Sequence, residues 1–152
     1  MMRKKSLVLI IQGLAVVGIV ISFYLFLSKL SSQFFCPVGD CQTVNNSEFA
    51  QIGPIPVSLM GVFFYIAISV LLEIKKRLDK RVFELVVRSV LIVGLLFSLY
   101  LTVVELAVLH AVCMWCVLSF FLVILMNLLY WIDAIKKRLL ISDNAKRMSE
   151  LL

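Results

Sequence analysis

Charged side chains are scarce in this chain. Only 16% of its 152 residues are Asp, Glu, Lys or Arg, whereas 62% are hydrophobic. A typical soluble domain is about 25% charged and about 45–50% apolar. A soluble chain of this length could not bury so much apolar surface, because folding hides only about 70% of what the unfolded chain exposes. The composition excludes an ordinary cytosolic domain and a disordered chain, and it indicates a single domain in a bilayer.

Four long apolar stretches predict an all-α integral membrane protein that is a bundle of four transmembrane helices. Crossing a hydrocarbon core takes about 20 helical residues, and backbone groups in lipid must find hydrogen bonds within their own segment. We expect a membrane domain over 1–132, with spans at about 6–28, 52–72, 82–109 and 111–132, and an amphipathic cytoplasmic tail over 133–152. A cleaved signal peptide is the rival interpretation of the first stretch, but the stretch is longer than the usual apolar run of about 7–15 residues.

The basic residues predict the orientation of these spans. Thirteen of the fifteen precede the first stretch, separate the second from the third, or follow the fourth, and Arg88 lies just inside the third stretch at the same end, so Lys29 is the exception. Apart from Lys29, the basic residues are Arg3, Lys4, Lys5, Lys75, Lys76, Arg77, Lys80, Arg81, Arg88, Lys136, Lys137, Arg138, Lys146 and Arg147. Because positive loops stay inside, we expect an inner-membrane protein with both termini in the cytoplasm. The net charge of +6 then reflects topology, and a nucleic-acid partner is not expected.

The same orientation places all four cysteines at or near the outer face. Cys36 and Cys41 lie in the long loop between the first two spans, where Gly39 and Asp40 suit a tight turn. Cys113 and Cys116 have the i, i+3 spacing of one helical face. They fall at the predicted start of the fourth span, where the helix dipole favours a thiolate, and Cys116 should lie about 4.5 Å deeper.

Three interpretations of the cysteines remain open at this point. A C-x-x-C spacing is typical of redox dithiols, and a bridge across so short a loop stabilises little. Two structural disulfides are the second interpretation. A zinc site is the third, although the chain has a single histidine and no acidic cluster to complete it.

Several segments, taken together and in order, resemble the bacterial and archaeal branch of the vitamin K epoxide reductase family. The loop cysteine pair comes first, followed by Ser47. Gly53-Pro54-Ile55-Pro56 then leads into Ser58-Leu59-Met60-Gly61 and Tyr65, and Ser98-Leu99-Tyr100-Leu101 precedes Cys113-Met-Trp-Cys116. The similarity covers about residues 6–132. Many bacterial relatives carry a fused thioredoxin-like domain, which we do not expect here.

The resemblance implies a relay of electrons from protein thiols to a quinone. A separate thioredoxin-fold (DsbA-like) partner would reduce the loop pair, with Cys36 facing the partner and Cys41 exchanging with Cys113. Cys116 resembles the cysteine that reduces a quinone of the ubiquinone or menaquinone type, without metal or flavin. Such a relay supports disulfide bond formation in exported proteins and proceeds through mixed disulfides.

The resemblance also suggests which residues surround these thiols. Ser47 is either a residue that orients the loop over the site or the N-cap of a short helix from Glu48. The quinone pocket is expected to include five residues: Val57, Gly61, Tyr65, Glu105 and Phe120. Animal members have asparagine at the position of Val57 and tyrosine at that of Phe120. These differences argue against specific epoxide reduction and favour oxidation of protein dithiols.

Two polar residues near the cysteines have alternative interpretations. Glu105 is either part of the proton traffic of quinone reduction or a half-hydrated acid at the membrane interface. His110 is either a proton donor near Cys113 or an interfacial turn residue. Two other functions remain as alternatives, namely a small structural membrane subunit with two structural disulfides and a vitamin K epoxide reductase proper.

Overall fold

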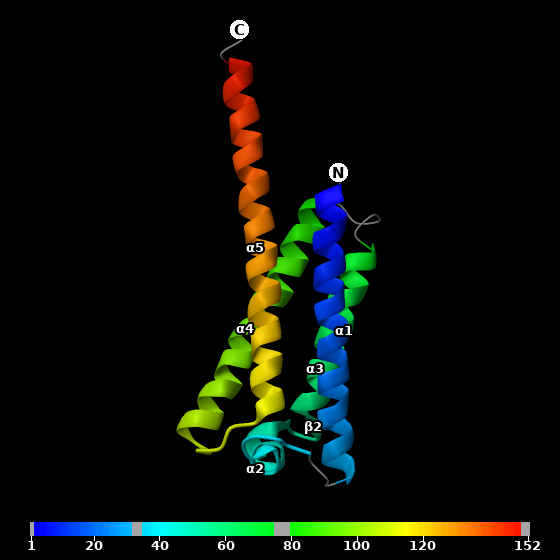
Figure 1. Ribbon diagram of the computed structural model, residues 1–152, viewed down its shortest axis with the longest axis vertical. Coiled ribbons are helices and arrows are strands. Elements are labelled where there is room, and N and C mark those ends of the chain that lie inside the picture. Colours follow the sequence, from blue (N-terminus) through cyan, green and yellow to red (C-terminus); the bar gives the residue numbers. More distant parts are fainter. Residues whose placement is uncertain (1, 32–34, 75–79, 150–152) are drawn as a thin grey trace.

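The computed structural model describes residues 2–31, 35–74 and 80–149, and four long helices dominate it (Figure 1). In chain order the elements are α1 (Met2–Ser31), α2 (Cys41–Asn46), the 3-10 helix η1 (Glu48–Ala50), β1 (Gln51–Ile52), β2 (Ile55–Pro56), α3 (Val57–Glu73), α4 (Lys80–Ala107) and α5 (Met114–Ser149). Helix α1 packs against α3 and α5, and α4 packs against the same two helices. The predicted all-α class is thereby confirmed.

Three of the long helices are long and apolar enough to cross a membrane. Within the described residues the qualifying segments are Ser6–Ser31, Arg81–Ala107 and Met114–Lys136. Helix α3 is apolar but has 17 residues, which at about 1.5 Å per residue extend over roughly 26 Å. This length is near the lower limit for a span, so a fourth crossing stays a prediction.

The second and fourth apolar stretches differ at their boundaries from the prediction. Residues 51–56 form an antiparallel hairpin, in which Gln51 lies opposite Pro56 and Ile52 opposite Ile55. Its turn has Gly53 at φ +61°, and Pro56 is the N-cap of α3. A run of turn and proline residues is unsuited to a helix interior, so the expected start at 52 is wrong and α3 begins at Val57.

Helix α5 begins at Met114 and not at 111, because residues 109–112 still belong to the turn after α4. It continues without a break to Ser149, since residues 131–149 contain no proline or glycine. The expected tail from 133 is therefore a continuation of the same helix. Lys75, Lys76 and Arg77, which contribute to the predicted orientation, lie outside the described residues.

Close contacts between small and aromatic residues join α1 to α3. A Cβ atom at Gly18 would lie 2.4 Å from the ring of Tyr65, and one at Gly61 would lie 2.8 Å from the Ser22 hydroxyl. Small residues let helix backbones approach in this way in membrane proteins. Tyr65 also reaches α5, because its hydroxyl lies 2.7 Å from Ser119 Oγ. The hydrophobic core continues from this ring along Ile68, Leu91 and Met126.

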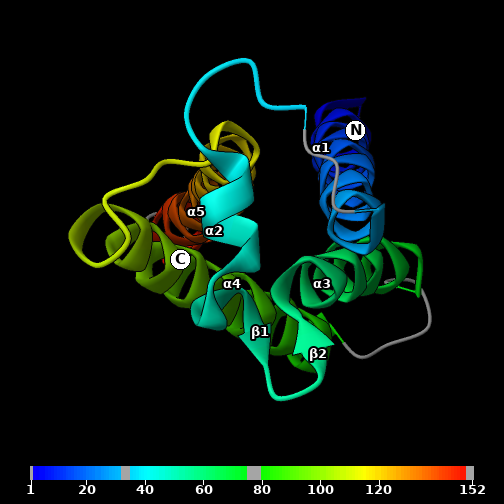
Figure 2. The same ribbon diagram turned by 90° about the horizontal axis from the view of Figure 1, so that it is seen from below.

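All the short elements gather at one end of the bundle. Seen from that end, α2 crosses over the ends of the long helices and the β1–β2 hairpin lies beside the start of α3 (Figure 2). The beginning of α1 and the end of α5 both lie at the opposite end (Figure 1). This arrangement brings the segments around both cysteine pairs to the same end of the molecule.

Candidate functional site

The loop cysteines are joined in a disulfide that is anchored at the first turn of α2. The Cys36–Cys41 bridge has a Cα–Cα distance of 5.9 Å, and Cys36 is half-buried while Cys41 is 0% exposed. The Asp40 side chain caps α2 by accepting the Thr43 N–H at 3.0 Å. The Thr43 hydroxyl also donates to this carboxyl group. The hydrogen bonds from the Thr43 hydroxyl and N–H hold the pKa of the exposed Asp40 carboxyl below its usual value. Capping fixes Cys41 with its sulfur turned inward.

The backbone next to this disulfide lies directly on the segment before α5. Asp40 N–H donates to the Val112 carbonyl at 2.9 Å, and Gly39 pairs with Cys113 in an antiparallel bridge. Gly39 has φ +86°, and a Cβ atom there would lie 2.1 Å from the Val112 carbonyl oxygen. Only glycine accommodates this combination without strain. The contact brings the loop pair onto the second pair.

Cys113 and Cys116 are free thiols at the N-terminus of α5. The Cys113 carbonyl accepts the first helical hydrogen bond from Val117, and its sulfur accepts the Cys116 N–H at 3.3 Å. The sulfur therefore takes the place of an N-cap oxygen. Its hydrogen bond with the Cys116 thiol lowers the pKa of Cys113. A helix N-terminus also favours a thiolate, so Cys113 is suited to nucleophilic exchange.

All four cysteines meet in one cluster. Cys41 and Cys113 are both fully buried in it, and Cys36 and Cys116 pack against it. The Asn45 amide on α2 links the two inner cysteines, since its Nδ2 donates to the Cys41 carbonyl at 3.0 Å and lies 3.7 Å from Cys113 Sγ. Two pairs that are far apart in sequence are therefore arranged for contact between Cys41 and Cys113.

Two aromatic side chains hold the residue that precedes Cys36. The Tyr24 hydroxyl accepts the Phe35 N–H at 3.0 Å and donates to the Phe35 carbonyl at 3.2 Å. Trp115, between the two cysteines of the second pair, donates its indole N–H to the same carbonyl at 3.0 Å. The two rings lie 5.2 Å apart. They fix the loop at its N-terminal side as the Gly39 contact fixes it near Cys41.

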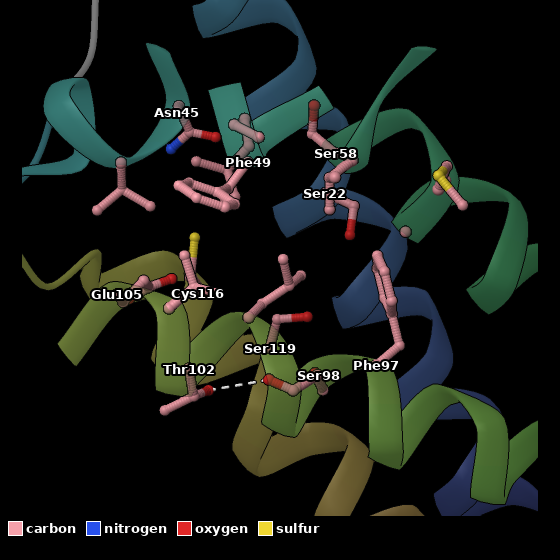
Figure 3. A pocket seen from close by; sticks show the side chains of 18 of the residues that line it. Ser22, Asn45, Phe49, Ser58, Phe97, Ser98, Thr102, Glu105, Cys116 and Ser119 are labelled. Carbon is pink, nitrogen blue, oxygen red and sulfur yellow. Dashed lines mark hydrogen bonds between the residues drawn. The ribbon is translucent and has the colours of Figure 1, made fainter. Parts of the chain in front are cut away.

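A cavity of about 310 Å³ lies beneath the cysteine cluster, between α1, α3, α4 and α5 (Figure 3). Its wall is mostly apolar, and of the four cysteines, all within the described residues, Cys116 alone lines it. The polar side chains around it are Ser22, Asn45, Ser47, Ser58, Tyr65, Ser98, Thr102, Glu105 and Ser119. Cys116 and Glu105 lie together on one side, and Ser22 and Ser58 lie on the other (Figure 3).

Glu105 joins the cavity to the second cysteine pair. Its side chain is 5% exposed, and its Oε2 accepts the Cys113 N–H at 3.1 Å. A half-hydrated position at the interface is therefore wrong for this residue. His110, by contrast, is an exposed turn residue at φ 47° whose Nδ1 lies 3.1 Å from the Leu106 carbonyl, so the structure favours the turn interpretation.

The sequence matches the vitamin K epoxide reductase family over residues 9–131. The chain belongs to this family. Membership implies a membrane oxidoreductase that acts on thiols and disulfides, and the family is associated with quinones in general. A comparison with curated proteins gives no match.

Four of the five expected pocket residues of this family member line the cavity. They are Val57, Gly61, Tyr65 and Glu105, whereas Phe120 does not line it. Cys116, Ser119 and Val123 turn toward the cavity at spacings of three and four residues, and the Phe120 ring lies beside Phe121 at 6.2 Å. The expectation for Phe120 is thus not supported, because Phe120 lies at the edge of the helix face that the cavity uses.

Ser47 has neither of the two expected roles in full. It occupies the N-cap position of η1, but its side chain makes no capping hydrogen bond there. Its hydroxyl donates to the Val44 carbonyl at 2.8 Å and so closes the end of α2. Because Ser47 also lines the cavity, it shapes the segment that covers the site.

Two residues of the site were missed by sequence reasoning. Asn45 is four residues after Cys41 and so shares its helical face, but this signal depends on knowing that 41–46 is a helix. Ser58 lines the cavity, and its buried hydroxyl has no hydrogen-bond partner among the described residues. The Ser58 hydroxyl can therefore form a polar contact with a ligand in the cavity, which the apolar side chain of the neighbouring Val57 cannot.

Gly39→Ala should uncouple the two cysteine pairs. The methyl group would clash with the Val112 carbonyl oxygen. Alanine would also have to adopt the positive φ of Gly39, which costs about 1–2 kcal/mol. The added methyl group should also push the loop away from Val112 and so misalign the reacting sulfur atoms. We therefore expect electron transfer from Cys36/Cys41 to Cys113/Cys116 to slow at least about tenfold. Rapid-quench alkylation of the four thiols measures this rate.

Gly53→Ala is the matched control for Gly39→Ala. Gly53 also has positive φ, at +61°, but nothing lies within 4 Å of its added Cβ atom. The control should lose similar stability and keep its transfer rate. Equal rates in both variants would show that the contact of Gly39 with Val112 is unimportant for transfer.

Proposed function

We propose that this protein is a quinone-dependent thiol oxidoreductase that reoxidises a separate thioredoxin-fold partner on the outer side of the cell membrane. The observation that carries the proposal is that the two cysteines of the second pair face different parts of the site. Cys113 is buried against the loop disulfide, whereas Cys116 faces a cavity between the helices. One cysteine pair can therefore exchange with protein thiols at one end and with a small apolar acceptor at the other.

The residues around the cavity fit a quinone. Small-molecule pockets are mostly apolar, with a volume of about 300–1,000 Å³ and a few polar groups that orient the ligand. The present cavity has about 310 Å³, an apolar wall, and polar side chains on two sides. A bound quinone supplies a two-electron, two-proton acceptor. Cys116 and Glu105 would hold one of its carbonyl groups and Ser58 the other.

Thiol exchange through the loop pair follows from the accessibility of its two sulfurs. A partner thiolate attacks the half-buried Cys36 and breaks the Cys36–Cys41 bond, and the second partner thiol then leaves both loop cysteines reduced. Cys41 attacks Cys113 in an oxidised Cys113–Cys116 pair and releases Cys116. Cys36 then attacks Cys41, which releases Cys113.

The final state of this exchange matches the bonding in the structure. The loop pair is a disulfide and the second pair is a dithiol. Closing the Cys113–Cys116 bond then releases two electrons and two protons beside the cavity. In this state Cys36 is ready for the next partner molecule.

The structure offers less support for the two alternatives. A structural subunit with two permanent disulfides needs a Cys113–Cys116 bond, and both of these thiols are free. Animal members of the family have a polar asparagine at the position of Val57, where it could form a hydrogen bond with vitamin K epoxide. Val57 lines the cavity with an apolar side chain, which cannot form that hydrogen bond. Oxidation of protein dithiols therefore remains the proposal.

A reconstituted assay tests the proposed function. Purified protein in lipid vesicles is mixed with a reduced thioredoxin-fold protein and either a benzoquinone or a naphthoquinone, and quinone absorbance is followed. We expect quinone loss to match the partner thiols oxidised, one quinone per two thiols. Thiol oxidation without quinone loss, or no turnover with any such partner, would refute the proposal.

The proposed orientation makes a separate prediction for intact cells. With both termini inside and the cysteines outside, a membrane-impermeant thiol reagent added after mild reduction should label Cys36, which is half-buried. Mass spectrometry of the labelled peptide measures the modification, and Cys36→Ser protein should lose that label. Labelling of the wild type in inverted vesicles alone would reverse the orientation.

A further inference from the structure

Glu105 is an acid in the wall of the cavity, at the place where α4 meets the second cysteine pair. Figure 3 shows its carboxyl group beside the Cys116 sulfur, with both side chains directed into the cavity. One oxygen, Oε2, accepts the Cys113 N–H at 3.1 Å, and Cys116 lines the same cavity as Glu105. Glu105 therefore lies beside both residues that the redox step joins.

The surroundings of Glu105 do not explain why an acid is needed. Among the described residues, the Glu105 carboxyl group accepts a hydrogen bond from Cys113 and forms no salt bridge with a lysine or arginine. Burying a carboxylate without a cation is costly. A neutral glutamine could accept the Cys113 N–H equally well. The feature that glutamine lacks is the ability to take up and release a proton.

We propose that Glu105 is the proton-transfer residue of the second cysteine pair. When the Cys113–Cys116 bond forms, the Cys116 sulfur loses its proton to the Glu105 carboxylate, and Glu105 passes this proton to the oxygen of a quinone bound in the cavity. The Cys113 proton leaves to water, and the second quinone oxygen takes its proton from water. Two electrons leave the thiols and two enter the quinone, so the step balances and Glu105 is regenerated.

This inference rests on the proposed function for its acceptor but not for its first step. The transfer from Cys116 to Glu105 belongs to oxidation of the dithiol by any two-electron oxidant. It can be examined in protein that contains no quinone. The two proposals can therefore fail separately.

The test uses Glu105→Gln, which keeps an oxygen that can accept the Cys113 N–H but cannot exchange a proton. Positioned proton transfer contributes about 10²–10⁴-fold to a rate, so quinone reduction by the full chain in vesicles should fall about 100-fold or more. Its solvent deuterium isotope effect should rise. Exchange between the partner and Cys36/Cys41 should stay at the wild-type rate, which shows that the variant is folded.

Infrared difference spectra of the quinone-free protein give a readout that is independent of turnover. Oxidising the dithiol with diamide should produce a carboxylic acid band in the wild type and no such band in Glu105→Gln. Glu73→Gln is the matched control, because Glu73 is an exposed acid at the far end of α3. It should keep both the band and the quinone reduction rate.

Each result has a definite meaning. A carboxyl band that persists in Glu105→Gln, or quinone reduction by this variant at the wild-type rate, would overturn the role of Glu105. If the wild type reduces no quinone, the proposed function fails, while the band still decides the first proton step. Loss of partner exchange in Glu105→Gln would assign Glu105 a structural role and also overturn the proposal.

Discussion

Cys116→Ser protein is expected to reduce no quinone and still to exchange disulfides with its partner. Of the four cysteines, Cys116 is the one that lines the cavity, and a serine hydroxyl cannot form the disulfide that releases two electrons. Turnover should fall below about one thousandth of the wild-type rate, because no other sulfur can take the place of the missing thiol. Quinone absorbance in vesicles measures the first property. Trapping of mixed disulfides with the partner measures the second.

Cys113→Ser is the informative comparison for this variant. Cys113 contacts the loop pair, so its loss should block both transfer from the loop and quinone reduction. Cys116→Ser should also stop electron transfer, because the accepting Cys113–Cys116 disulfide cannot form. Unlike Cys113→Ser, it leaves Cys113 able to attack the loop disulfide and form a bond with Cys41. Residual steady turnover in Cys116→Ser would show that another group delivers electrons to the cavity, and the order of the relay would then be wrong.

The features of the site that the sequence predicts are those that depend on residues close together in the chain. The two cysteine pairs and the helix start beside Cys113 follow from short motifs and helical spacing. The pocket positions of Val57, Gly61 and Tyr65 follow from the resemblance to the family. Long apolar stretches likewise predict the long helices. Each of these depends on residues within one or two helical turns.

What the sequence did not predict depends on contacts between distant segments. Phe35 is held by Tyr24 and Trp115, which lie 11 and 80 residues away from it. Neither partner carries a local signal for this contact, and Trp115 alone is typical of an interfacial aromatic residue. The family resemblance predicts Phe120 in the pocket, because animal members have tyrosine at this position, but the packing of α5 directs Ser119 there instead.

The loop disulfide is held on both sides, and this has a consequence for the relay. The Phe35 contacts lie before Cys36, and the Gly39 and Asp40 contacts lie beside Cys41. Neither the loop nor α2 must move far for Cys41 to meet Cys113, since both are buried in one cluster. Transfer between the pairs is therefore expected to need side-chain rearrangement more than a large loop closure.

The double variant Cys36→Ser, Cys116→Ser should accumulate a Cys41–Cys113 disulfide when it is treated with a mild oxidant, which takes up the two electrons of these thiols. Each substitution removes a thiol that would break this bond, so the bond persists once it has formed. A disulfide requires Cα atoms within about 7 Å. The pairing of Gly39 with Cys113, and the Asn45 amide between Cys41 and Cys113, support such an approach. Mass spectrometry without reduction should find one peptide pair that joins two cysteines 72 residues apart.

The variant Cys41→Ser, Cys116→Ser is the matched control, because it leaves Cys36 in place of Cys41. Cys36 is half-buried at the surface of the cluster, whereas Cys41 and Cys113 are fully buried. We expect little Cys36–Cys113 bond in this control under the same mild oxidant. Equal trapping in both variants would mean that the loop has no preferred register over Cys113. Free Cys41 and Cys113 in folded Cys36→Ser, Cys116→Ser protein would refute the electron route through these two sulfurs.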